Sequence, residues 1–172
     1  YLSLQLFRNK FNLFLGEIEN LSFGHGYLLS NYGNNYNYPI EKKIGINFRL
    51  NNKNNSVIYQ FFASSIRDLF NSGSLVGNHL SLLLADSFPL RFGFGHIIDL
   101  NQLNNYRENM DNRAVNTFEI DFDFPVFSQN LLFIGELSGI FLPETRYYQR
   151  GDDDQTTNDK KFRNGIWGIL FP

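Results

Sequence analysis

Residues 115–124 read V-N-T-F-E-I-D-F-D-F, and this alternating stretch constrains the fold more than any other part of the chain. From Phe118 on, every second residue is a large hydrophobe, and the residues between them, Glu119, Asp121 and Asp123, are all acids. A period of two is typical of a β-strand, because successive side chains on a strand leave opposite faces of the sheet. The stretch therefore predicts a strand with one apolar face and one acidic face. Two environments suit such a strand: a soluble sheet with a dry inside, or a membrane barrel with lipid outside and a wet lumen.

The composition narrows the possible classes of function. The 172 residues include 15 Lys or Arg and 17 Asp or Glu, so the net charge of -2 gives no basic field for nucleic acid. The mean hydropathy of -0.29 excludes a helical membrane protein, and no apolar run approaches the roughly 20 residues that a transmembrane helix needs. The 19 Phe and 9 Tyr favour β-structure. The absence of Cys excludes disulfide scaffolds, thiol catalysis and cysteine metal sites.

The same alternation recurs along the chain and predicts about 8–10 strands in total. The connections between them alternate between long and short, so in an up-and-down meander the long ones share one rim of the sheet and the short ones the other. A single helical turn is expected at residues 66–70. The other predicted strands are residues 1–8, 11–19, 21–29, 43–50, 56–63, 79–85, 90–98, 129–142 and 162–171.

Short turns on one rim and longer loops on the other are typical of bacterial outer-membrane barrels. With the alternating strands and the glycine–aromatic stretch at residues 16–32 (G-E-I-E-N-L-S-F-G-H-G-Y-L-L-S-N-Y), the chain resembles bacterial outer-membrane β-barrel proteins over nearly its whole length. The resemblance implies an all-β fold: an antiparallel up-and-down transmembrane β-barrel, or a partial barrel, located in the bacterial outer membrane. We expect one domain over residues 1–172, incomplete at one or both ends because the alternation breaks off there.

This interpretation assigns side chains to two environments. A charged lumen serves either as a wet channel wall, where acids favour cations, or as a buried ionic network that fills a narrow barrel. Arg91 and Asp123 are expected to pair, because both lie near the short-turn rim of neighbouring strands. The residues expected to face the lumen are Arg49, Arg91, Glu119, Asp121, Asp123 and Glu136, and those expected to face lipid are Phe92, Phe94, Phe118, Ile120, Phe122 and Phe124.

Three other groups of residues invite a functional interpretation. The only histidines are His25, His79 and His96, and glycines next to His25 and His96 leave space around those two rings. No carboxylate stands at a recognised metal-ligand spacing, so structural roles are expected and neither a metal nor a cofactor is predicted. An acidic run near residue 153 suits either Ca²⁺ or plain solvation in a surface loop. Most Tyr residues and the Trp stand at strand ends or in long connections, as interface girdles do, although loop packing predicts the same. The acidic run is Asp152, Asp153 and Asp154; the aromatic set is Tyr27, Tyr32, Tyr36, Tyr38, Tyr59, Tyr106, Tyr147, Tyr148 and Trp167.

The chain contains no Ser in a nucleophile-elbow context and no recognisable nucleophile with its base and orienting acid, so an enzyme is not expected. The predicted function is that of a pore, a passive transporter or a surface scaffold. Its expected partners are outer-membrane lipid and small solutes or ions that cross the lumen. The main rival is a soluble secreted or periplasmic β-barrel or sandwich that buries the same hydrophobic residues and binds a lipid or glycan. A third hypothesis is a surface-barrel hydrolase.

Overall fold

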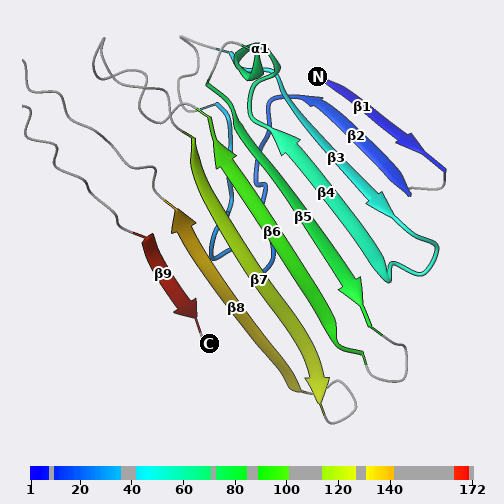
Figure 1. Cartoon of the computed structure of the whole chain (residues 1–172). Coiled ribbons are helices and arrows are strands. Elements are labelled where there is room, and N and C mark those ends of the chain that lie inside the picture. The colour runs from blue at the N-terminus through cyan, green and yellow to red at the C-terminus, as the bar shows by residue number, and fades with distance from the viewer. Residues whose placement is uncertain are drawn as a thin grey trace, which may run out of the picture.

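The computed structural model describes residues 1–7, 10–35, 42–70, 73–84, 89–100, 114–126, 131–141 and 165–170. These residues form one nine-stranded antiparallel sheet in which every strand pairs with its neighbours in sequence (Figure 1). The strands are β1 (Leu2–Leu6), β2 (Phe11–Gly16), β3 (Gly45–Asn51), β4 (Val57–Ala63), β5 (Leu75–Leu83), β6 (Arg91–Asp99), β7 (Val115–Val126), β8 (Leu131–Phe141) and β9 (Gly165–Leu170), and α1 (Ile66–Leu69) lies between β4 and β5.

The antiparallel up-and-down meander predicted from the sequence is confirmed. A closed barrel is not formed by the described strands, because β1 and β9 lie at the two edges of the sheet. The alternation of connections also holds: β1–β2, β3–β4, β5–β6 and β7–β8 are joined by short turns, and the other pairs by longer segments. The long connections therefore leave one rim of the sheet, where α1 also lies (Figure 1).

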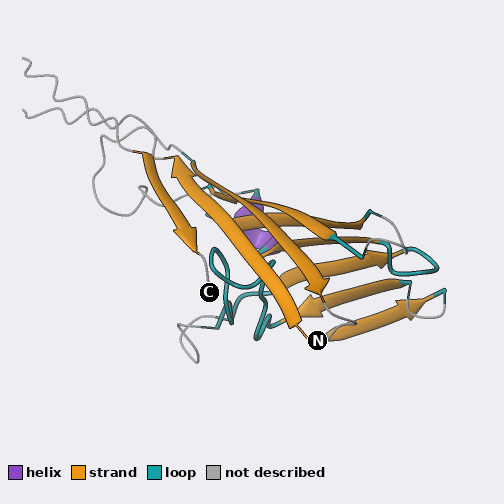
Figure 2. Cartoon of the chain, turned by 90° about the horizontal axis from the view of Figure 1, so that it is seen from below, coloured by secondary structure: helices purple, strands orange, loops and turns teal. Residues whose placement is uncertain are grey.

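Residues 21–29 were predicted as a strand, and that prediction is wrong. They belong to residues 18–34, here called the inner segment, which lies against one side of the curved sheet (Figure 2). The segment forms no β-pairing with a strand of the sheet. It contains one isolated β-bridge, between Leu21 and Tyr32. Asn20 and Asn31 hold φ of 55° and 51°, a left-handed backbone that Asn tolerates better than most residues. These two bends fold the segment back on itself, so its alternating hydrophobes pack on the sheet instead of pairing within it.

The main hydrophobic cluster lies between the inner segment and the sheet. The ring of Phe23 meets that of Phe62 edge-on, with 5.4 Å between the centroids. Each such side chain stabilises the folded chain by about 1.5–3 kcal/mol when it leaves water. The buried members are Ile18, Leu21, Phe23 and Leu29 from the inner segment and Phe62 and Ile97 from the sheet. The inner segment is therefore a packed part of the fold.

The ends of the inner segment are fixed by Asn34. Its Oδ1 accepts a hydrogen bond from the backbone N–H of Ile18 at 2.8 Å, and its Nδ2 donates to the carbonyl oxygen of Ser64 at 2.7 Å. The backbone N–H of Asn34 also donates to the carbonyl oxygen of Ile18, at 3.1 Å. Because Asn34 is buried, these hydrogen bonds tie both ends of the segment to the β4 rim.

The register of the strands sorts the side chains onto two faces. Residues directly opposite one another in an antiparallel pair share a face, so a row of partners across the sheet identifies it. The face under the inner segment, the inner face, carries Phe62 and Ile97 of the hydrophobic cluster and, beside them, a polar band. One such row runs through Asn12, Arg49, Gln60, His79, Gly95, Glu119 and Ser138.

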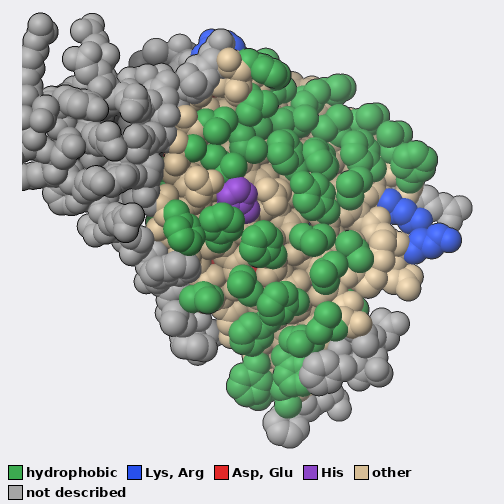
Figure 3. All heavy atoms as spheres, viewed as in Figure 1, with side chains coloured by type: hydrophobic (Ala, Val, Ile, Leu, Met, Phe, Trp, Pro, Cys, Tyr) green, Lys and Arg blue, Asp and Glu red, His purple; other side chains and the backbone are tan. Residues whose placement is uncertain are grey.

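The outer face is apolar. Figure 3 views the molecule from this side and shows hydrophobic side chains spread over most of the described strands. Phe92 and Phe94 are 41% and 43% exposed, and their neighbours are similarly open. Other large hydrophobes exposed on this face are Leu4, Leu50, Val57, Leu82, Ile120, Phe122, Leu131, Phe133, Leu137 and Phe141. The outer face of the described sheet is therefore apolar, and the inner face carries the polar row.

Candidate functional site

The residues predicted to face a lumen lie on the inner face, and those predicted to face lipid lie on the outer face. Glu119, Asp121 and Glu136 are buried beneath the inner segment, and Glu119 has no exposed surface at all. The three carboxyl groups therefore lie within a buried polar part of the fold. The apolar set occupies the opposite face, with Phe92, Phe94, Ile120 and Phe122 exposed and Phe118 and Phe124 half-buried.

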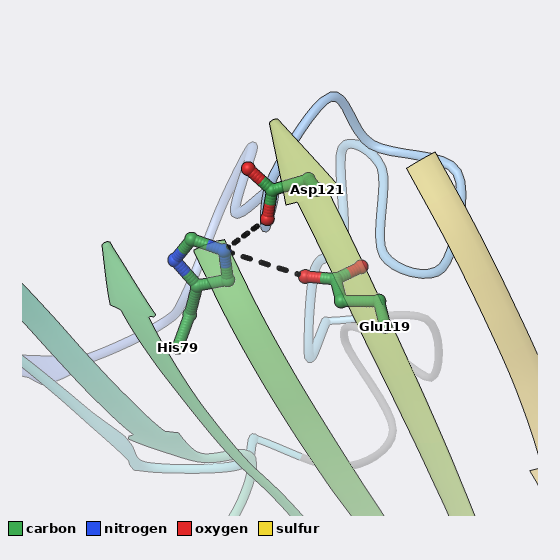
Figure 4. Close-up of side chains that lie close together, drawn as sticks. All are labelled: His79, Glu119 and Asp121. Carbon is green, nitrogen blue, oxygen red and sulfur yellow. Dashed lines mark hydrogen bonds and ion pairs between the residues drawn. The ribbon is translucent and has the colours of Figure 1, made fainter. Parts of the chain in front are cut away.

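Three of the buried groups form a cluster that spans three strands. His79 of β5 places its Nε2 2.8 Å from Oδ2 of Asp121 and 3.7 Å from Oε1 of Glu119, both on β7 (Figure 4). The His79 ring is held from the other side by Phe23 of the inner segment, at 5.6 Å between centroids. The imidazole and the two carboxylates therefore meet in a packed and largely buried environment.

Glycines of β6 make this meeting possible. The register places Gly95 between His79 and Glu119, and Gly93 between Ser81 and Asp121. A Cβ atom on Gly93 would overlap the Asp121 carboxylate, and one on Gly95 would overlap the Glu119 carboxyl group. Without a side chain on β6, groups from β5 and β7 reach each other over the top of the intervening strand.

Glu136 of β8 connects the sheet to the turn of the inner segment. Its carboxylate accepts backbone N–H hydrogen bonds from His25, Tyr27 and Leu28, at 3.1, 3.1 and 3.2 Å. Hydrogen bonds to a charged acceptor contribute more than neutral ones, about 1.5–3 kcal/mol each where they are well shielded. Gly24 in the same turn lies directly over Asp121. The acidic patch thus anchors the segment that covers it.

Glu119 differs from its neighbours because it has no such partner. Among the described residues neither of its carboxylate oxygens has a hydrogen-bond partner, although the side chain is fully buried. The carboxyl groups of Glu136 and Asp121 stand close enough to act on it, so like charges meet in a place that water does not reach. A buried unpaired carboxylate is costly, and the cluster needs additional positive charge, from a proton or a cation.

The predicted pairing of Arg91 with Asp123 is not the arrangement observed. The two residues are register partners, but Asp123 pairs with His25 Nε2 at 2.8 Å. Arg91 donates instead to Ser81 Oγ and to the carbonyl oxygen of Asn55, each at 3.1 Å. Asp123 therefore pairs with the inner segment instead of with Arg91. A prediction made from the two strands alone does not include His25.

The remaining inner and outer candidates have separate surroundings. Arg49 is exposed and donates from Nε to Asn51 Oδ1 at 3.2 Å, away from the cluster. His96 lies on the outer face, stacked on Phe118 at 4.4 Å between centroids and bonded to Asn116. Neither residue contributes to the buried cluster.

Most residues of the predicted aromatic girdle, and the whole acidic run, lie outside the part of the chain that the structure describes. Tyr27 and Tyr32 belong to the inner segment and Tyr59 to the outer face. The side chain of Trp167 and residues Tyr36, Tyr38, Tyr106, Tyr147, Tyr148, Asp152, Asp153 and Asp154 lie outside the described residues.

The cluster around His79 was not predicted from the sequence. Its carboxylates lie far from the histidine along the chain, and Asp121 stands 42 residues away. The alternation itself contained the signal. It places the histidine and the two acids on the same face of two strands, and the strand between them carries Gly93 and Gly95 on that face.

No helix in the described part of the chain is both long and apolar enough to cross a membrane. Comparisons with protein-family models, curated proteins and solved structures found no match to this chain.

Proposed function

We propose that this chain forms part of a transmembrane β-barrel of a bacterial outer membrane, with its outer face against lipid and its inner segment inside the lumen. The observation that supports the proposal best is the contrast between the two faces of one sheet. Large hydrophobes are exposed on the outer face, while Glu119, Asp121 and Glu136 are buried on the inner one. A soluble sandwich has the opposite arrangement, with hydrophobes packed inside and charges toward water.

The size of the apolar face favours lipid over water as its surroundings. Soluble monomers rarely expose a continuous apolar surface as broad as this one, and such surfaces mark membrane or protein contacts. On β6 and β7 alone, Phe92, Phe94, Ile120 and Phe122 each leave more than a third of their surface open. In a bilayer these side chains meet hydrocarbon and the cost of their exposure disappears.

The lengths of β5–β8 are compatible with a membrane crossing, whereas β1–β4 and β9 have only 5–7 residues each. β5 and β6 have 9 residues each, β8 has 11 and β7 has 12. A tilted strand of about 9–11 residues crosses the hydrocarbon core. Because lipid offers no hydrogen bonds, the proposal also requires the free edges of β1 and β9 to be paired within the bilayer, by strands outside this sheet.

The inner segment supports a constricted barrel rather than a wide pore. It packs on the inner face through Phe23 and Leu29 and is anchored by Glu136 and Asn34. Space that an open channel would leave to water is therefore filled by protein. The resulting function is that of a surface scaffold, or of a narrow uptake route through which solute passes only when the inner segment moves.

Cell fractionation tests the proposal. The chain, produced with an export signal in a Gram-negative host, should sediment with the outer membrane. It should resist extraction by alkaline carbonate and dissolve in detergent. A protein that stays monomeric in buffer without detergent would contradict the membrane location and favour a soluble β-protein with a covered apolar face.

A further inference from the structure

We propose that His79, Glu119 and Asp121 bind one divalent transition-metal ion of the Zn²⁺ class on the inner face of the sheet. The site lies beneath the turn of the inner segment and links β5 to β7 across β6 (Figure 4). The inference concerns a ligand of the folded sheet and does not depend on whether the outer face meets lipid.

The geometry fits such an ion. Each residue offers one ligand atom, and the three atoms lie within 4.8 Å of one another. His79 Nε2 is 2.8 Å from Asp121 Oδ2 and 3.7 Å from Glu119 Oε1. Ligand atoms at about 2.0–2.1 Å from a tetrahedral Zn²⁺ lie roughly 3.3 Å apart, between these two separations. These two separations bracket the tetrahedral value, and a shift of the Glu119 carboxylate toward His79 and Asp121 would complete the coordination.

The unpartnered carboxylate of Glu119 provides an independent argument. Its oxygens are buried and bonded to no described residue, and one of them points at the same His79 nitrogen that Asp121 contacts. His79 Nε2 is already hydrogen bonded to Asp121, which leaves the Glu119 oxygens without a hydrogen-bond partner among the described residues. A divalent ion balances both carboxylates and leaves the imidazole neutral, as a metal ligand must be.

The donor set indicates the class of metal. One imidazole nitrogen with two carboxylate oxygens suits Zn²⁺ and its transition-metal neighbours, whereas Ca²⁺ and Mg²⁺ prefer oxygen donors alone. Glu136 is not a fourth ligand, because its oxygens accept the backbone N–H groups of the inner segment. The remaining position is left for water, and Glu136 holds the cover of the site in place.

Metal titration of the folded, chelator-treated protein tests the proposal, in detergent if the protein requires it. Calorimetry with ZnCl₂ should show one ion per chain, and CaCl₂ or MgCl₂ should bind far more weakly. Glu119→Gln and His79→Gln should each weaken zinc binding at least about tenfold. His96→Gln is the matched control, because this histidine lies on the outer face, and its zinc affinity should equal that of the wild type.

Thermal unfolding keeps the test decisive if a variant alters the fold. In chelator, Glu119→Gln should melt at a temperature close to that of the wild type, because a neutral amide replaces a buried carboxyl group that a proton neutralises when no metal is bound. In excess zinc the wild type should melt at the higher temperature, because the variant lacks one of the three ligands. The proposal is overturned if the wild type takes up no zinc, if calcium binds as tightly as zinc, or if Glu119→Gln shifts the melting temperature equally in both conditions. The last result would assign the cluster to a purely structural ionic network.

Discussion

His79 Nε2 lies 2.8 Å from Asp121 Oδ2, although the two residues stand on β5 and β7 with β6 between them. The contact depends on Gly93 and Gly95, which leave the inner face of β6 bare exactly where the side chains cross it. Glycine usually weakens a strand. Here the two glycines leave room for polar side chains that connect β5 and β7 across β6, and the inner segment packs on these side chains. The sheet and the buried cluster therefore stabilise each other.

Substitution of Gly93 should reveal this dependence. We expect Gly93→Ala to destabilise the protein by about 1–3 kcal/mol, because the new methyl group overlaps the Asp121 carboxylate. Asp121→Ala in the same chain should remove the overlap, so the double variant should be less destabilised than the sum of the two single variants. Chemical denaturation of all four proteins measures the coupling. Strictly additive effects would show that the glycine does not serve to admit Asp121.

Removal of the Glu136 carboxylate should release the inner segment. We expect Glu136→Ala to increase hydrogen exchange at the amides of His25, Tyr27 and Leu28 at least about tenfold, because each loses its acceptor. Ser138→Ala provides the control, since Ser138 is buried on the same strand and face. Unchanged protection in Glu136→Ala would mean that the hydrophobic contacts alone hold the segment.

A charge placed on the outer face should distinguish lipid from water. If the outer face meets lipid, Ile120→Lys near the middle of β7 should destabilise the protein by about 2–4 kcal/mol in a bilayer. Leu131→Lys, at the end of β8, should cost about 0–1 kcal/mol, because the side chain lies near the membrane surface. Unfolding in lipid vesicles compares the two variants. Equal, near-zero effects would indicate that the outer face meets water.

Asp68 in α1 should contribute a pH-dependent term to stability. Burial raises its pKa, but hydrogen bonds with Ser65 and Arg67 and the charges of Lys43 and Arg67 outweigh burial, so the pKa of Asp68 is lowered overall. Because the folded pKa lies below the unfolded one, the stabilisation is present above the unfolded pKa and is lost as pH falls through the folded value. Asp68→Asn should therefore cost up to about 1 kcal/mol at neutral pH and less under acidic conditions.

The pH profile of unfolding for wild type and Asp68→Asn checks this expectation. The stability difference between the two proteins should shrink steadily as the pH falls through the acid range. Asp99→Asn serves as the comparison variant, because it removes the charge of a carboxylate at the end of β6, at the same rim of the sheet. A difference between wild type and Asp68→Asn that does not change with pH would exclude the charge of Asp68 as its cause.

The nine strands of the sheet, their up-and-down order and the sorting of side chains onto two faces follow from local patterns in the sequence. Phe118 and Glu119 had to leave β7 on opposite sides, because a strand turns by half a revolution per residue whatever surrounds it. The alternation of long and short connections likewise depends only on residue order along the chain. Properties that are local to a segment can be predicted from that segment.

The position of the inner segment and the groups that meet beneath it depend on contacts between distant parts of the folded chain. Residues 21–29 alternate like a strand. They pack on the inner face instead, because space is available there and the inner segment forms hydrogen bonds with Glu136 and Asn34. The cluster of His79, Glu119 and Asp121 depends on the register of three strands and on two bare glycine positions between them. Contacts of this kind join residues far apart in sequence, so no single stretch of the chain specifies them.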